Sequence, residues 1–556
     1  MRIIKTIKVS LTISLIVISA FLMTGFTSKN FEIAKHLDIF TTLFRELVLN
    51  YVDEVNPSEI IKTGIDEMLY SLDPYTNYIS ESQIEDVRFM TTGQYGGIGA
   101  LIHRRGDYVY ISEPYEGFPA YKAGLLAGDK ILKINGQSVE SLGVDEVRTL
   151  LQGQPGTSLL LTIERIGEPA PLQKNLVREV VTIDNIPYFG MLDNHTGYIK
   201  LNGFTQQASR EVRQAFNTLR NDHDIQHIVI DLRGNGGGLL HEAVNITNLF
   251  VDKNKLVVST KGRIADRNTT HRTLNDPIDK DIPLAILVDR QSASASEIVA
   301  GAVQDFDRGV VIGQRTFGKG LVQNVVPLSY NTQLKVTVAK YYIPSGRCIQ
   351  AIDYAQRNED GSVAMIPDSL KVAFQTLNGR TVYDGGGIEP DVFIDPASYG
   401  QVTIALMNQF MIFDYANHFY RNNDSIAPAE TFVITDAIYQ DFLRFVNEKE
   451  FDYTTESERR LERLRQASMD EQYFSSIESE FDSLKNKLLH NKDEDLITFR
   501  DEISRLLKEE IATRYYHQRG RVLSSLSSDP EVEEVLKLFA QKDRYSAILN
   551  GGGNQR

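Results

Sequence analysis

A short run of small residues, Ser292–Glu297 (SASASE), could place a serine nucleophile at the end of a strand. The apolar run Leu284–Asp289 predicts a buried strand before it, and Ser296–Phe306 has the pattern of a helix after it. The alanines leave room for a substrate, and the N–H groups of a first helical turn favour developing negative charge. Ser294 and Glu297 also stand in S-x-x-E spacing, which is typical of a helix N-cap. The segment alone therefore supports two interpretations of Ser294, a nucleophile and a cap.

A serine nucleophile needs a base, and Lys319 is the candidate that the sequence offers. It lies between two glycines, in a loop that follows the predicted strand Val310–Gly313. A lysine acts as a base only where burial lowers its pKa toward neutrality. The alternatives for Lys319 are a solvated loop lysine and a salt-bridge partner.

Two glycine-rich segments resemble nucleotide-binding loops but lack a decisive residue. Gly313–Lys319 (GQRTFGK) matches the first seven positions of a phosphate-binding loop, yet Gly320 stands where a hydroxyl must bind Mg²⁺. Gly234–Gly238 (GNGGG) follows a predicted strand, yet Leu239 stands where a dinucleotide loop has its last glycine. Both segments therefore argue against a nucleotide-binding protein.

Metal and thiol chemistry have little support in the sequence. His241–Asn245 (HEAVN) lacks the second histidine of a helical zinc site. Cys348 is the single cysteine, which excludes a multi-cysteine metal site, and a buried inert thiol is its simplest interpretation. We therefore expect neither a metal nor a cofactor.

Length and charge set wider limits. The 556 residues suggest about three or four domains, and 42% hydrophobic and 24% charged residues are typical of a globular chain. The 59 basic and 74 acidic residues give a net charge of −15, which argues against a nucleic-acid partner.

The N-terminal segment, residues 1–28, predicts export. A basic start precedes the uncharged stretch Val9–Ser28, whose 28 − 9 + 1 = 20 residues could just span a bilayer. The basic side should stay in the cytoplasm, so the chain from Lys29 onward should be translocated, which predicts a periplasmic protein. Cleavage as a signal peptide and retention as an inner-membrane anchor both stay open, and the alternative is a buried core helix.

Two regions have helical spacing of apolar residues, residues 29–90 and residues 396–556. In the first, Asn56 and Pro57 predict the start of a helix that Asp73-Pro74 should stop. In the second, Ser528–Glu531 predicts the start of the last helix. The second region contains no group of residues that predicts a site, and it matches no pattern of a family that we can assign.

Residues 91–175 change to short strand-like runs with glycine-bearing turns, such as Tyr108–Ile111, Lys130–Ile134 and Leu159–Glu164. A glycine-rich loop (YGGIG), then AGL, then GDKILKING follow in order, and this succession resembles a PDZ domain. The resemblance implies that the backbone N–H groups of the loop bind the C-terminal carboxylate of a peptide, which adds a strand to the sheet edge. The residues of this loop are Tyr95, Gly96, Gly97, Ile98 and Gly99.

Residues 176–395 alternate predicted strands and helices, which indicates an α/β core. Three of its segments, SASASEIVAGA, RTFGKGLVQ and AKYYIPSGR, together with DLRGNGGG and GGGIEPD, resemble the C-terminal processing peptidases (tail-specific proteases, peptidase family S41). The resemblance covers roughly residues 37–395. It implies a multidomain α+β protein: a crotonase-like α/β peptidase core with an inserted PDZ domain and flanking helical regions.

The resemblance implies a Ser–Lys dyad supported by a glutamine. The family's nucleophile is the middle serine of SASAS, here Ser294, and its base falls in the FGKG loop, here Lys319, with 319 − 294 = 25. Its glutamine comes four residues later, at Gln323.

Further site residues follow from the same motifs. The oxyanion donors should be the N–H of Ala295 and one N–H of the glycine-rich loop, that of Gly236 or Gly237. Gly234 stands where many relatives have Asn. Asp305 matches an acidic position that we interpret as structural support.

The expected function is an exported serine endopeptidase that binds substrate C-termini with its PDZ domain and cleaves nearby. Its partners should be proteins or peptides with free, apolar C-termini, and a homodimer or larger assembly is expected. An adaptor protein stays open. The alternative is a non-catalytic envelope scaffold that binds C-termini through the PDZ domain.

Overall fold

The computed structural model describes residues 30–357, 362–449, 451–488 and 492–551. The predictions for residues 1–28 lie outside these ranges. The chain forms two compact units, residues 1–78 and 79–556. None of the helices in the described ranges combines the length and apolar character that crossing a bilayer requires.

The described part of the first unit is mostly helical, as the sequence predicts, but its last two residues begin the strand β1 (Asn77–Ile79), which the sequence did not predict. A helix covers residues 30–50, and α2 covers Pro57–Tyr70. Asn56 caps α2, since its side chain accepts a hydrogen bond from the N–H of Ser58, and Pro57 takes the first helical position, where no N–H is needed.

The predicted PDZ domain is an antiparallel sheet with two helices. Its strands, in spatial order, are β3 (Ala100–Arg105), β4 (Tyr108–Pro114), β5 (Lys130–Ile134), β7 (Ser158–Glu164) and β8 (Leu172–Val177). Its helices are α4 (Pro119–Lys122) and α5 (Val144–Leu151), whose Val147 and Leu151 pack into the buried core. β2 (Gln94–Gly97) pairs separately with β9 (Glu179–Thr182). β3 forms the edge of the sheet in the described part of the chain, which leaves one side of it open to a further strand.

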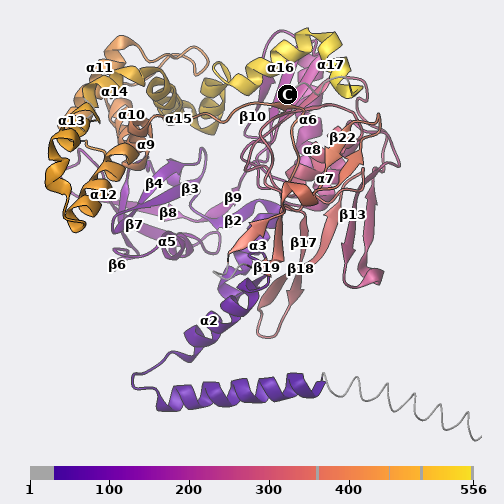
Figure 1. Ribbon diagram of the computed structural model, residues 1–556, viewed down its shortest axis with the longest axis horizontal. Coiled ribbons are helices and arrows are strands. Elements are labelled where there is room, and N and C mark those ends of the chain that lie inside the picture. The colour runs from indigo at the N-terminus through magenta and orange to yellow at the C-terminus, as the bar shows by residue number, and fades with distance from the viewer. Residues whose placement is uncertain (1–29, 358–361, 450, 489–491, 552–556) are drawn as a thin grey trace, which may run out of the picture. The chain divides into compact units, whose positions relative to one another are not determined.

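A second sheet organises the predicted peptidase core (Figure 1). Its order is β10 (Tyr188–Met191), β11 (Thr196–Lys200), β12 (His227–Asp231), β15 (Leu284–Val288), β16 (Val310–Gly313) and β23 (Val392–Phe393). All neighbours are parallel except β10 and β11. The strands and helices predicted here are confirmed to within a few residues.

Alternate residues of the core strands face two different helical layers. Ile228, Ile230 and Ile286 belong to one apolar cluster, with residues of α6 (Ala208–Asp222), α7 (Leu240–Asn248) and α8 (Ala295–Asp305). Val229 and Leu287 belong to another cluster. That second cluster is completed by the C-terminal helices α16 (Pro530–Ala540) and α17 (Lys542–Leu549). The last helices of the chain therefore cover one face of the core sheet.

An antiparallel sheet lies beside this core and holds a long hairpin. The hairpin consists of β17 (Leu321–Pro327) and β18 (Gln333–Tyr342). β18 also pairs with β13 (Leu256–Gly262), which pairs with β14 (Thr269–Arg272).

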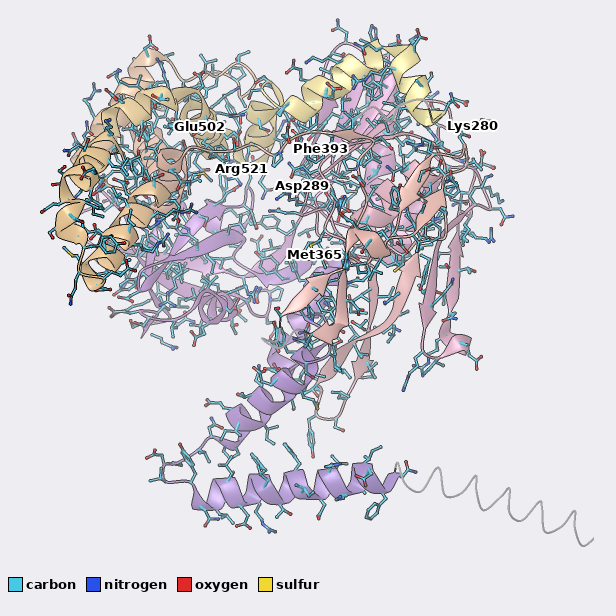
Figure 2. All side chains as sticks on the ribbon, in the orientation of Figure 1. Lys280, Asp289, Met365, Phe393, Glu502 and Arg521 are labelled. Atoms are coloured by element: carbon cyan, nitrogen blue, oxygen red, sulfur yellow. The ribbon has the colours of Figure 1, made fainter. Side chains whose placement is uncertain are left out.

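A helical region follows the peptidase core and contacts the predicted PDZ domain. Its helices are α9 (Gln401–Asn408), α10 (Met411–Asn422), α11 (Asp436–Glu448), α12 (Glu456–Asp470), α13 (Glu478–Leu488), α14 (Lys492–Thr498) and α15 (Arg500–Leu526). Residues of α9, α10, α11, α14 and α15 share a separate apolar cluster. Arg105 forms an ion pair with Asp414 at 2.8 Å. Arg521, labelled in Figure 2, lies 3.3 Å from Glu113 on β4. A backbone kink interrupts α15 at His517.

Candidate active site

Ser294 stands at the turn between β15 and α8. Its φ of 57° and ψ of −112° are uncommon for a residue with a side chain, and such conformations concentrate at functional sites. Its N–H donates to Oε2 of Glu297 at 2.8 Å, and its carbonyl accepts the hydroxyl of Tyr341 at 3.1 Å. Ser294 is thus the N-cap residue of α8, as the spacing allows. This does not exclude a nucleophile, because the hydrogen bond to Glu297 uses the backbone N–H and not the hydroxyl.

Glu297 connects the Ser294 turn to the loop of Lys319. Its carboxylate is fully buried, with 0% exposed. Besides the N–H of Ser294, it accepts the Thr316 hydroxyl at 2.6 Å, the Gly318 N–H at 2.7 Å and the Lys319 N–H at 2.9 Å. Burial raises the pKa of Glu297, while the hydrogen bond from Thr316 and those from the backbone oppose that shift. One side chain therefore holds both segments that carry the predicted dyad.

The sequence motifs assign Glu297 only a capping role. The sequence did contain a signal that Glu297 has further partners, because it is a charged residue inside a helix whose other positions are small or apolar up to Gln304. A charge in such a helix must find partners within the fold.

The loop of Lys319 follows β16 and leads into β17. Gly318 has a φ of +85°, and a Cβ there would lie 2.4 Å from Cβ of Ala351. A Cβ on Gly320 would lie 2.8 Å from the Gln350 N. Both glycines are thus required by close approach, and they fix the backbone on either side of a half-buried Lys319.

The glycine-rich loop after β12 lies against the Ser294 turn. The Asn235 carbonyl accepts the Ala293 N–H at 3.0 Å and the Ser296 hydroxyl at 2.9 Å. Asn235 is fully buried, and its Nδ2 donates to the Leu201 carbonyl at 2.7 Å. Asn235 therefore joins the loop to the turn.

The two candidate oxyanion glycines differ in their surroundings. A Cβ on Gly237 would lie 2.6 Å from the Ala293 carbonyl oxygen and 2.9 Å from the Ala295 N, whereas a Cβ on Gly236 would meet nothing within 4 Å. The Gly237 N–H donates to Oδ1 of Asn235 at 2.9 Å. In the described ranges, the N–H groups of Gly236 and Ala295 have no acceptor. Gly237 therefore allows the loop to lie close to the Ser294 turn, and Gly236 provides a backbone N–H that is available to an oxyanion.

Gln323 lies on β17, four residues beyond Lys319. Its Nε2 donates to Oγ1 of Thr337 on β18 at 3.2 Å, next to a bulge between Val322 and Gln323. A bulge redirects a side chain relative to a regular strand. Its expected role in orienting Lys319 stays a prediction.

Asp305 lies at the opposite end of α8 from Ser294. At 1.5 Å per residue, the 305 − 294 = 11 steps along the chain between them span about 16 Å. Asp305 accepts the Arg347 guanidinium at 2.9 Å and the Ser345 N–H at 2.9 Å. Burial raises the pKa of Asp305, and the positive charge of Arg347 opposes this rise. This position suits structural support and does not contact the Ser294 turn.

The predicted peptide-binding loop of the PDZ domain is shaped by its glycines. A Cβ on Gly96 would lie 2.2 Å from the Gly153 carbonyl oxygen, and Gly99 has a φ of +71°. The carbonyls of Ile98 and Gly99 accept the N–H groups of Ala120 and Tyr115, which follow β4. In the part of the chain that the structure describes, the N–H groups of Ile98 and Gly99 have no acceptor. The loop therefore offers free donors beside the open edge of β3.

The surroundings of His241–Asn245 and of Cys348 do not suit metal or thiol chemistry. His241 is exposed, whereas Glu242 is buried and accepts the Ser209 N–H at 2.7 Å. Burial raises the pKa of the Cys348 thiol, which disfavours the nucleophilic thiolate. Over the described ranges, no group of three or more His, Cys, Asp or Glu could hold a metal ion.

Family models match three stretches of the chain. "Peptidase family S41" matches residues 195–356 and "PDZ domain" matches residues 110–165. "Probable PDZ-protease, C-terminal helical domain" matches residues 402–539, so the helical region has a family pattern that its sequence motifs did not reveal.

Known proteins align over most of the same length. The chain is 35% identical to a carboxy-terminal-processing protease of Bartonella bacilliformis, over 62% of this chain and 79% of that one. It is 31% identical to a probable CtpA-like serine protease of Staphylococcus aureus, over 66% and 67%. A solved structure, the photosystem II D1 C-terminal processing protease, is 30% identical over 65% of this chain and 88% of that one, with a TM-score of 0.37. The chain therefore belongs to peptidase family S41, among the carboxy-terminal processing proteases that carry a PDZ domain.

Proposed function

We propose that this protein is an exported endopeptidase that binds the C-termini of protein substrates and cleaves them with Ser294 as nucleophile and Lys319 as base. The main support for the proposal is the position of Glu297. Its buried carboxylate accepts hydrogen bonds from the backbone N–H groups of both Ser294 and Lys319. The sequence motifs of the S41 family point to the two residues, and this buried carboxylate gives a physical reason why the Ser294 turn and the Lys319 loop stay together.

The proposed mechanism uses Ser294, Lys319 and the neighbouring backbone N–H groups. Unprotonated Lys319 takes the proton of the Ser294 hydroxyl, and Oγ attacks the carbonyl carbon of the scissile peptide bond. The resulting oxyanion accepts hydrogen bonds from the N–H groups of Ala295 and Gly236. Lys319 then returns the proton to the leaving amine, and water hydrolyses the acyl-enzyme. Gln323 orients Lys319, and the core belongs to the crotonase-like α/β architecture.

The decisive experiment compares the parent protein with Ser294→Ala. Each is mixed with an unfolded protein that ends in small apolar residues, and fragments are followed by mass spectrometry. We expect fragments from the parent alone, with equal circular dichroism for the two proteins. Cleavage by both would identify another nucleophile. Binding of the tail without cleavage by either would favour the PDZ scaffold.

The PDZ domain has a second expected role, in activation. The free N–H groups of its loop suit a carboxylate, and the open edge of β3 suits an added strand. A peptide with a free apolar C-terminus should raise the turnover of a separate reporter substrate, and amidation of the peptide should abolish that rise. Equal turnover with both peptides would remove this role.

The proposal that the protein is exported rests on the sequence of residues 1–28. Cell fractionation tests this proposal. We expect the protein outside the cytoplasm, and deletion of residues 1–28 should retain it inside. The mass of the mature protein distinguishes a cleaved signal peptide from a retained anchor.

A further inference from the structure

We propose that Arg233 is a positioning residue for the oxyanion loop, Gly234–Gly238, and that carboxylates at the start of α16 hold Arg233 in place. The inference rests on the proposed function, because it concerns the geometry of the same loop. It gives the end of the chain, far from the catalytic motifs in sequence, a defined part in the reaction.

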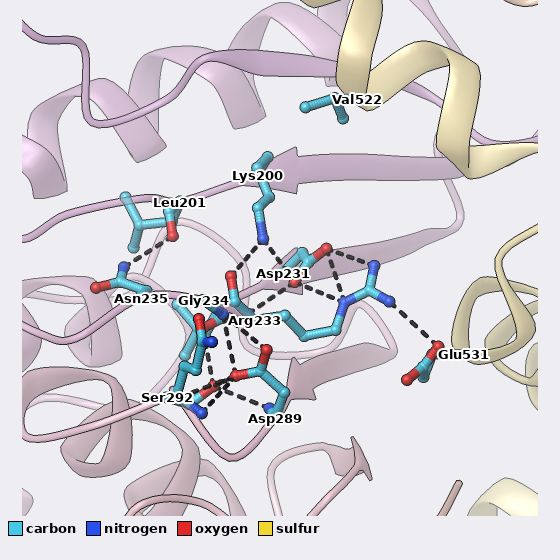
Figure 3. Close-up of polar contacts among 12 residues, drawn as sticks. Lys200, Leu201, Asp231, Arg233, Gly234, Asn235, Asp289, Ser292, Val522 and Glu531 are labelled. Carbon is cyan, nitrogen blue, oxygen red and sulfur yellow. Dashed lines mark hydrogen bonds and ion pairs between the residues drawn. The ribbon is translucent and has the colours of Figure 1, made fainter. Parts of the chain in front are cut away.

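Arg233 is the last residue before the loop, and Figure 3 shows its guanidinium between the carboxylates of Asp231 and Glu531. Its guanidinium lies 2.7 Å from Asp231, 2.7 Å from Asp529 and 3.3 Å from Glu531. The side chain is 17% exposed. A planar guanidinium with several fixed donors can serve three carboxylates at once, which an ammonium group cannot do with the same geometry.

The backbone of Arg233 is fixed from the opposite side. Nζ of Lys200 donates to the Arg233 carbonyl at 2.6 Å and lies 3.1 Å from Asp231. Asp289 then accepts the Gly234 N–H at 3.0 Å. The peptide units that lead into the loop are thus held by charged side chains on both sides.

The buried carboxylate of Asp231 requires both Arg233 and Lys200 as its charge partners. It is 1% exposed, and the charges of Arg233 and Lys200 outweigh burial and hold the pKa of its carboxyl well below the usual range. A buried carboxylate in this state needs both cations, because an unpaired buried charge is strongly destabilising. Asp231 alone would therefore keep Arg233 nearby, but it leaves the outer part of the guanidinium without a partner.

The start of α16 supplies the missing partners in a rigid form. Asp529 is the N-cap residue, and its Oδ1 accepts the N–H groups of Glu531 and Val532 at 3.0 and 3.1 Å. Val532 and Val535 pack into the apolar cluster on the core sheet. The two carboxylates are therefore fixed relative to the strands, and through Arg233 they fix the loop that follows β12.

The test removes the two charges while keeping the shape of the helix. In Asp529→Asn/Glu531→Gln, Asn still caps the helix. We expect kcat to fall about 10- to 100-fold, since a displacement of about 1 Å in a catalytic group has an effect of this size. KM should change less than about twofold, because the substrate-binding groups are untouched. Glu531→Gln alone should show a smaller loss of kcat.

The control lies on the same helix. Glu533 pairs with Lys537 at 2.7 Å on the exposed side, so Glu533→Gln removes a similar charge without reaching Arg233. It should leave kcat within about twofold of the parent. Full activity of the double variant, or an equal loss in Glu533→Gln, would overturn the proposal.

A second measurement does not depend on cleavage. Amide hydrogen exchange should be at least about tenfold faster in the peptide that covers the loop of the double variant, with exchange in α16 unchanged. Unchanged exchange in the loop would overturn the proposal. If the parent itself does not cleave, the proposed function fails, while hydrogen exchange still decides whether these carboxylates hold the loop.

Discussion

The two ends of α8 each carry a buried carboxylate, but their partners differ in kind. Glu297, at the N-terminal end, is held by N–H groups and a hydroxyl from the Ser294 turn and the Lys319 loop. Asp305, at the C-terminal end, is held by the guanidinium of Arg347 together with one N–H. Both are fully or nearly fully buried, at 0% and 3% exposed.

This difference separates positioning from support. Short hydrogen bonds to backbone N–H groups fix the direction of each peptide unit, so Glu297 determines where the segments bearing Ser294 and Lys319 lie. An ion pair such as Asp305–Arg347 mainly neutralises buried charge. Changes near Glu297 should therefore reduce the rate, and changes near Asp305 should reduce stability.

Removal of the proposed base is the strongest test of the N-terminal end of α8. Lys319→Ala should lower peptide turnover by at least about 10³-fold, because the Ser294 hydroxyl then has no proton acceptor. Turnover and circular dichroism are measured together. Lys340→Ala, an exposed lysine on β18, is the matched control and should stay near the parent rate. Equal losses in the two variants would argue against a specific role for Lys319.

Glu297→Ala should show the next largest loss of turnover, about 10²- to 10³-fold, since the segments of the dyad lose their common acceptor. It should also lower the free energy of unfolding by about 1–3 kcal/mol for the donors left unsatisfied. Glu297→Gln keeps one carbonyl oxygen as acceptor, so it should lie between Glu297→Ala and the parent. A variant that is destabilised yet fully active would assign Glu297 to support alone.

A pair of glycine variants refines the oxyanion assignment. Gly237→Ala should lower turnover about 10²-fold, because its Cβ would lie 2.6 Å from the Ala293 carbonyl oxygen and its φ is +99°. Gly236→Ala should keep turnover within about fivefold, since its Cβ meets open space and its N–H is retained. The opposite order of the two effects would place the unoccupied donor elsewhere.

At the other end of α8, stability should change and the chemistry should not. Asp305→Asn leaves the buried Arg347 without its carboxylate and should lower the free energy of unfolding by about 3–5 kcal/mol. Turnover per folded molecule should remain near that of the parent at low temperature. Thermal unfolding and active-site titration separate these two quantities. A large loss of turnover in fully folded Asp305→Asn would end the distinction between the two ends.

The weakest effect is expected at the contact between the PDZ domain and the helical region. His103 stacks on Tyr110 and Phe410, with centroid distances of 5.7 and 4.8 Å. Burial, and then the charge of Arg105, lower the pKa of His103, while Asp414 opposes them. The fold thus favours neutral His103, so its stabilising effect is complete above pH 6.5 and declines below it.

Lowering the pH from 7.5 to 5.5 should therefore lower Tm by about 2 °C more in the parent than in His103→Phe, which keeps a ring and cannot be protonated. Differential scanning calorimetry at both pH values measures this difference. The same shift in both proteins would assign the acid sensitivity to other groups.

The sequence predicted the elements and the motif residues but not their connections. The runs that became β12, β15 and α8 were visible because alternation and helical spacing are local signals. The contact between Arg233 and Asp529 could not be predicted in this way, since these residues are 296 positions apart and each has an ordinary local role. Likewise, the spacing of Glu297 revealed a cap, but only the fold brings Thr316 and Gly318 to it.

The covering of the core sheet by α16 and α17 has a consequence for synthesis. Until the ribosome has added residues 529–549, one face of β12, β15 and β16 lacks its apolar partners, and Arg233 lacks Asp529 and Glu531. Domains otherwise tend to fold in order as they emerge. We therefore expect the nascent chain to have little peptidase activity until α16 and α17 have been added and have packed on the sheet.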